Sequence, residues 1–74
     1  MPRYFFHVYN GDDIPDLEGV ELPGPEEARN TAVTACGEAL KDLDGEFWQF
    51  REWRMLVQDW QGRVICELKF HGKR

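Results

Sequence analysis

Residues Pro25–Leu43, PEEARNTAVTACGEALKDL, form the stretch that decides the fold, because no other segment combines this length with helical periodicity. Small and apolar side chains recur along it at the spacing of one half-buried helix face. That face holds Ala28, Ala32, Ala35, Cys36, Ala39 and Leu43. Gly24 and Pro25 suit the start of a helix, and Gly45 suits its end. Alanines fill little space, so we expect the helix to lie close against a sheet with large side chains.

The segment before the helix predicts one long strand and one short strand. Arg3–Tyr9, RYFFHVY, is rich in aromatic and β-branched residues, which is typical of a strand. We expect one face of this strand to point toward the helix and the other to point away. The inward set is Tyr4, Phe6 and Val8, and the outward set is Phe5, His7 and Tyr9. Asn10–Asp13 predicts a turn. We interpret Val20–Leu22 as a return strand, which makes the helix run parallel to the first strand.

The segment after the helix predicts a β-hairpin. Trp53–Gln58 and Arg63–Phe70 both alternate, and Asp59–Gly62 between them has a glycine where a hairpin loop needs a positive φ. The residues expected to face inward are Trp53, Met55, Val57, Val64, Cys66, Leu68 and Phe70. Those expected to face outward are Arg54, Leu56, Gln58, Ile65, Glu67 and Lys69. Glu46–Glu52 has no clean period, and we interpret it as a connection folded over one end of the core.

These elements predict an α+β two-layer sandwich, an antiparallel three- to four-stranded sheet with one helix across one face in the order β-(β)-α-β-β. Residues 1–74 are expected to form a single domain, with 71–74 as a frayed tail. The net charge of −5 disfavours binding to nucleic acid or to an anionic membrane. No apolar run is long enough for a membrane helix. Cys36 and Cys66 lack metal or redox spacing, so we expect buried, reduced thiols and a cytoplasmic protein.

The chain resembles a family of small uncharacterised bacterial proteins classed as a domain of unknown function. The resemblance rests on the opening MPRYFFHVYNGD, on Glu18–Leu22 within DLEGVELP, on the helix start PEEARNTAV and on the final hairpin with its DxxGR loop. It implies a bacterial cytosolic domain and assigns no activity, cofactor or catalytic residue. Two positions depart from the family pattern, Gly24-Pro25 in place of an acidic cap and Trp60 in place of a polar loop residue.

Two sets of residues invite a chemical hypothesis. The acidic set could bind a metal, with His7, Asp12 and Asp13 as the contacts, but it fails the calcium-loop pattern. Its members, Asp12, Asp13, Asp16, Glu18 and Glu21, are better interpreted as turn-forming acids. His7 could act as a general base. The chain has no serine to serve as its nucleophile, and the threonines Thr31 and Thr34 lie on the helix. We therefore expect no enzyme activity and no cofactor.

The outer sheet face is the surface that the sequence favours as functional. Apolar and aromatic residues are expected on the side of the sheet away from the single helix, and such a patch is typical of an interaction site. The alternative, which stays open, is that they are scattered surface hydrophobes or are covered by Phe47–Phe50. The predicted interaction residues are Phe5, His7, Tyr9, Leu56, Ile65 and, at the hairpin tip, Trp60. The leading hypothesis is a non-enzymatic interaction module that forms a homodimer or binds a protein partner through this face or a strand edge.

Two alternatives to this hypothesis stay open. One is a small-molecule or metal-binding accessory protein that uses His7 and the acidic turn, although no small-molecule ligand can be identified. The other is an antitoxin-like nucleic-acid binder, which the charge disfavours. Its basic residues would be Arg51, Arg54, Arg63, Lys69, Lys73 and Arg74.

Overall fold

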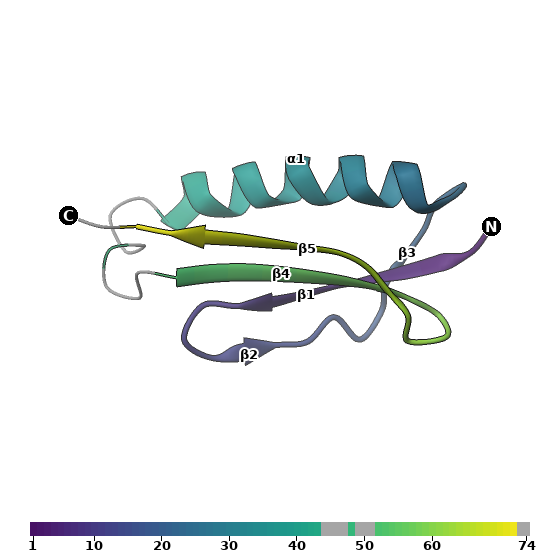
Figure 1. Cartoon of the computed structure of the whole chain (residues 1–74), viewed down its shortest axis with the longest axis horizontal. Helices are drawn as coiled ribbons and strands as arrows, with labels where there is room; N and C mark the ends of the chain where they lie inside the picture. Colours follow the sequence, from purple (N-terminus) through teal and green to yellow (C-terminus); the bar gives the residue numbers. More distant parts are fainter. Residues whose placement is uncertain (44–47, 49–51, 73–74) are drawn as a thin grey trace.

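The computed structural model describes residues 1–43, 48 and 52–72 and shows a sheet with one helix against one face (Figure 1). The described elements are β1 (Arg3–Tyr9), β2 (Asp13–Ile14), β3 (Val20–Glu21), α1 (Pro25–Leu43), β4 (Glu52–Asp59) and β5 (Val64–His71). Every strand pairing is antiparallel. The predicted α+β two-layer sandwich is thus confirmed.

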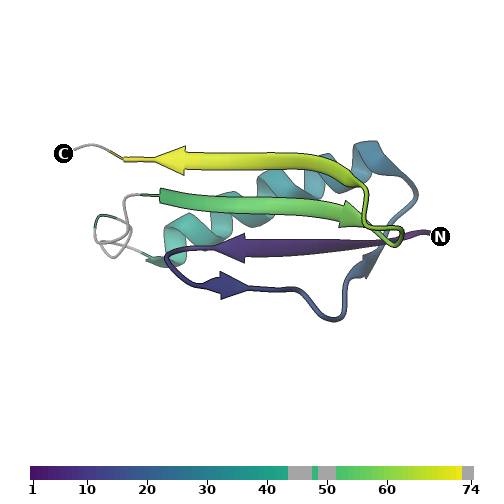
Figure 2. The ribbon, with the colours of Figure 1, turned by 60° about the horizontal axis from the view of Figure 1, so that its bottom comes forward.

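The first strand lies inside the sheet. The strand order is β2-β1-β4-β5, and β3 pairs with β1 beside β2 (Figure 2). Tyr4 pairs with Asp59 of β4 and with Val20 of β3, whereas Val8 pairs with Met55 of β4 and with Ile14 of β2. One edge of β1 therefore binds a long strand and the other edge binds two strands of two residues each.

The predicted return strand is present, and a further strand was not predicted. Val20–Glu21 pairs with the start of β1, and the Leu22 N–H donates to the Pro2 carbonyl at 3.0 Å. The helix runs parallel to β1, as expected when a return strand lies between the two (Figure 1). Asp13–Ile14 also pairs with β1, so the sheet has five strands instead of three or four. Two residues inside an acidic turn carry no alternating pattern that could have revealed this strand.

The helix has the predicted start and the predicted buried face. The Gly24 carbonyl accepts the first helical hydrogen bond, from the Ala28 N–H at 3.1 Å, and Pro25 occupies the first helical position, where a missing N–H costs nothing. Ala28, Ala32 and Cys36 are fully buried. Their small size lets α1 pack closely across β4 and β5. Gly45 and most of Glu46–Glu52 lie outside the described residues.

Large side chains of the sheet fill the core beneath this helix face. Tyr4, Trp53, Met55 and Val57 are buried with the three helix residues. The packed but partly exposed members around them are Phe6, Val8, Leu22, Ala35, Ala39, Leu40, Leu43, Ile65, Cys66, Leu68 and Phe70. The inward set predicted for β1 and β4 is confirmed.

A β-bulge corrects the predicted facing of β5 at its start. Val57 pairs with Cys66, but the next residue, Gln58, pairs with Val64, so Ile65 is an extra residue in the ladder. A bulge shifts the alternation by one residue. Val64 is consequently 58% exposed, whereas Ile65 packs against the core. The predictions that Val64 faces inward and Ile65 outward were wrong.

At the other end of β5, His71 is the last strand residue and pairs with Glu52, although the sequence analysis placed it in a frayed tail.

In the part of the chain that the structure describes, no helix has the length and apolar character needed to cross a membrane.

Candidate functional site

Two loops share the spacing Asp-x-x-Gly, and the aspartate of each one fixes the loop by hydrogen bonds. In Asp59–Gly62, the Asp59 Oδ1 atom accepts hydrogen bonds from the N–H groups of Gln61 (2.8 Å) and Arg63 (2.9 Å). The Arg63 Nε atom donates to Asp59 Oδ2 at 2.9 Å. Gly62 has a φ of 83°, a left-handed conformation that glycine adopts without strain. The carboxylate thus fixes the β4–β5 hairpin loop from within.

The Asp16–Gly19 loop is also fixed by hydrogen bonds to its aspartate, and it lies against the edge of β1. Asp16 Oδ1 accepts from the N–H groups of Glu18 (3.1 Å) and Gly19 (3.0 Å), and Asp16 Oδ2 accepts from the Phe6 N–H at 3.0 Å. Gly19 has a φ of 73°. The Arg3 guanidinium donates to the Glu18 carbonyl at 2.7 Å. Asp16 therefore satisfies the one β1 N–H group that lies between β2 and β3.

The two aspartates make the stability of the folded protein depend on pH. Burial opposes ionisation of Asp16, but the hydrogen bonds that it accepts from the N–H groups of Gly19, Phe6 and Glu18 outweigh it and lower the pKa of Asp16 below its ordinary 3.8. The pKa of Asp59 is lowered in the same way, since the N–H groups and guanidinium that it binds outweigh its burial. Folding therefore favours the ionised carboxylates.

We expect this contribution to stability to be complete above about pH 5 and to disappear as the pH falls through the lowered native pKa values. Urea unfolding between pH 2.5 and 6 tests this for the wild type and for Asp16→Asn. Asparagine has a single acceptor oxygen and no charge, so the stability of the variant should fall less steeply below pH 4. An identical slope in both proteins would contradict the assignment.

His7 is held by the same loop. The Asp16 N–H donates to His7 Nδ1 at 3.0 Å, so this nitrogen carries no proton and the neutral ring carries its proton on Nε2. The His7 ring stacks on Phe5, with ring centroids 6.4 Å apart and planes 9° from parallel. Asp16 thus orients the ring through its backbone N–H.

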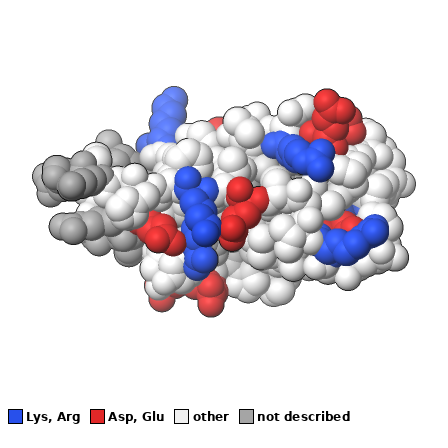
Figure 3. All heavy atoms as spheres, in the orientation of Figure 1, with Lys and Arg blue, Asp and Glu red and all other residues white. Residues whose placement is uncertain are grey.

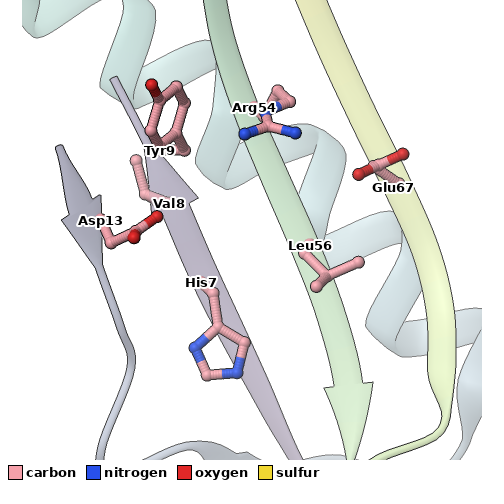
Figure 4. Close-up of a pocket in the computed structure, with 7 residues that line it drawn as sticks. All are labelled: His7, Val8, Tyr9, Asp13, Arg54, Leu56 and Glu67. Carbon is pink, nitrogen blue, oxygen red and sulfur yellow. The ribbon is translucent and has the colours of Figure 1, made fainter. Parts of the chain in front are cut away.

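A shallow pocket of about 140 Å³ lies next to His7 on the outer sheet face (Figure 4). Its lining comes from four strands and consists of His7, Val8, Tyr9, Asp13, Arg54, Leu56 and Glu67. The Arg54 guanidinium lies over the Tyr9 ring, 4.5 Å from its centroid. Arg54 Nε is buried and lies 3.3 Å from Glu52 Oε1, an ion-pair distance without hydrogen-bond geometry. The pocket thus combines an apolar floor with charged groups of both signs.

Four of the six residues predicted as an interaction surface share the outer face, and two do not. Phe5, His7, Tyr9 and Leu56 are half-buried neighbours on β1 and β4, with His7 paired to Leu56. Ile65 packs on the helix side because of the bulge. Trp60 is 54% exposed at the hairpin tip, where it lines a separate hollow near the start of α1.

The proposed metal contacts are not brought together. His7 and Asp13 line the same pocket, and Asp12 is not part of its lining. Within residues 1–43, 48 and 52–72, no group of three or more His, Cys, Asp or Glu side chains could hold a metal ion.

The thiols are free and are poor nucleophiles. Burial raises the pKa of Cys36 to about 11, and nearby Cys66 adds to this shift. The Cys36 thiol donates to Met55 Sδ at 3.7 Å. Burial also raises the pKa of Cys66, against an opposing effect of Arg29. Both thiols therefore stay protonated near neutral pH.

The basic residues do not form a surface of one sign. Each one that the structure describes from the predicted basic set lies near a carboxylate. The pairs are Arg54 with Glu52 (3.3 Å), Arg63 with Asp59 (2.9 Å) and Lys69 with Glu67 (3.7 Å). Figure 3 shows positive and negative groups interleaved on the face in view.

Two contacts of the site were missed by sequence reasoning. The position of Arg54 over Tyr9 depends on strand register, which no local pattern reveals. The role of Asp16 had a signal, because Asp16–Gly19 and Asp59–Gly62 share one spacing and only the second was interpreted as a structured loop.

No curated protein and no solved structure matches the chain. Residues 3–71, which include every strand and the helix described above, match the DUF6894 family. The chain therefore belongs to this family, which is defined as a domain of unknown function.

Proposed function

We propose that the domain is a non-enzymatic interaction module that self-associates or binds a protein partner through the outer sheet face or a strand edge. A cytoplasmic setting, which two unpaired thiols favour, and the bacterial origin implied by the resemblance are part of this proposal.

The observation that carries the proposal is the difference between the two faces of the sheet. One face is covered by α1. The other presents Phe5, His7, Tyr9 and Leu56, with the Asp16–Gly19 loop beside His7 and Phe5. In Figure 2 no helix covers this side of the sheet. A row of half-buried aromatic and apolar side chains beside a small pocket suits the anchor side chain of another protein.

The same geometry argues against catalysis. His7 uses one ring nitrogen to accept a hydrogen bond from the backbone, and both thiols have raised pKa values. The outer-face pocket of about 140 Å³ is also smaller than the clefts of about 300–1,000 Å³ that hold most small ligands. At the outer face, these features favour a binding role over catalysis at His7.

Light scattering over a concentration series tests the proposal with Leu56→Glu and a matched control, Thr34→Glu. Leu56 lies on the outer face, whereas Thr34 is exposed on the helix. We expect the wild type to have a mass above that of one 8.7 kDa chain. A mass lowered by Leu56→Glu alone assigns the outer face, and a mass changed by neither variant assigns a strand edge. A wild-type monomer at every concentration contradicts self-association.

A further inference from the structure

The two edges of the sheet differ in how they are closed. The edge beyond β1 is divided between β2 and β3, and Asp16 satisfies the Phe6 N–H between them. The opposite edge is β5, eight residues long, and it pairs only with β4 among the described strands (Figure 2). Long open edge strands are uncommon because their free N–H and C=O groups recruit another strand.

We infer that a second copy of this chain pairs with β5, antiparallel and about a two-fold axis at Leu68, to form one continuous sheet. The inference rests on the proposed function, because it names the partner and the surface of that self-association. The two-fold operation places both helices on one side of the joined sheet and both outer faces on the other.

The charges of β5 fit this register. Residues on either side of Leu68 would face each other across the axis, so Glu67 would lie opposite Lys69 of the second copy, and the reverse. Within one chain, Lys69 pairs in register with Arg54, a like charge, and has Glu67 of its own strand 3.7 Å away. The second copy would therefore supply each Lys69 with a further carboxylate.

The helix lies at the distance that such a dimer needs. α1 contacts both β4 and β5 and crosses them obliquely (Figure 2). At Cys36, which contacts Met55 of β4 and lies near Cys66 of β5, we place its axis above the gap between these strands. With strands about 4.8 Å apart, the two-fold operation places the second helix about 10 Å away, close to the usual separation of packed helices. Cys36 contacts Met55, the register partner of Leu68, so the middle of α1 lies level with the axis.

The side of α1 that faces β5 has an exposed apolar residue and open space against which a second helix could pack. Arg29 lines a hollow with Val64 and Ile65 of β5, and Val33 follows one turn later on the same side. Val33 is 61% exposed, and a Cβ added at Gly37 would meet nothing within 4 Å. An exposed valine next to a glycine without neighbours permits the close approach of a second helix.

Charge reversal tests the register in the full chain by light scattering. Glu67→Lys and Lys69→Glu should each weaken the dimer about tenfold or more, because each creates two like-charge contacts across the axis. The double variant E67K/K69E exchanges the charges and should return the dissociation constant to within about threefold of the wild type. Val33→Glu should also weaken the dimer, and Thr34→Glu, on the exposed helix surface, should not. Far-UV circular dichroism checks that each variant folds.

The outcomes separate this inference from the proposed function. Loss of the dimer in both single variants with recovery in the double variant supports the pairing of β5. A dimer that ignores all three variants and dissociates with Leu56→Glu overturns the inference and keeps the outer face as the site. A wild-type monomer at every concentration overturns both the pairing and the self-association.

Discussion

Replacement of Trp53 by alanine is expected to lower the free energy of unfolding by about 4 kcal/mol, the usual cost of removing a large buried ring. Trp53 is 2% exposed and packs against Phe70, with ring centroids 6.1 Å apart. A domain of this size has roughly 4–11 kcal/mol of total stability. Urea unfolding followed by circular dichroism should therefore show a variant that is at best marginally folded.

Trp60→Ala is the matched control, because it removes the same ring from a position that is 54% exposed. Its stability should stay within about 0.5 kcal/mol of the wild type. Trp53→Phe, which keeps a ring in the core, should fall between the two. A loss below about 1 kcal/mol for Trp53→Ala would contradict the central place of this ring in the core.

Gly19→Ala should have the second largest effect, a loss of about 3 kcal/mol. Its φ of 73° costs an alanine about 1–2 kcal/mol. The added Cβ would also lie 2.8 Å from Arg3 Cγ, 2.9 Å from Phe5 Cε1 and 2.9 Å from the Tyr4 carbonyl oxygen. Arg3 can move, but the backbone of β1 cannot without breaking its pairing. Thermal unfolding measures the loss.

Gly62→Ala isolates the conformational part of that cost. Gly62 has a similar φ of 83°, and a Cβ there would meet nothing within 4 Å. We expect a loss of about 1 kcal/mol from the backbone alone. Equal losses for the two variants would show that the loop at Gly19 does not press against β1.

The sequence was sufficient for the parts of the fold that have a regular period. The helix Pro25–Leu43 has the expected bounds, and β1 and β4 have the expected inner faces, because alternation and helical spacing directly reflect burial. The hairpin loop at Asp59–Gly62 followed from the conformational freedom of glycine. Val20–Glu21 was also found, since a short apolar pattern there could return to β1.

The features that escaped prediction depend on single residues or on register. The bulge at Ile65 adds one residue and reverses the facing of Val64 and Ile65, which no pattern of a strand in isolation reveals. Of the predicted interaction set, Phe5, His7, Tyr9 and Leu56 lie together on the outer face, and their role in an interaction stays a prediction. The function itself stays a proposal, because the residues of the outer face do not by themselves specify one partner, ligand or reaction.

The central position of β1 also determines when the protein can fold during its synthesis. Tyr4 pairs with Asp59, which lies much later in the chain. β1 is therefore synthesised well before β4, its long partner, and cannot pair with it until β4 has been made. Contacts between residues so far apart in sequence slow folding, whereas the β4–β5 hairpin can form by itself at once. In the interval, the aromatic segment RYFFHVY is exposed in an unfolded chain. Aggregation of nascent protein is therefore expected to begin at β1, where chaperones would be needed most.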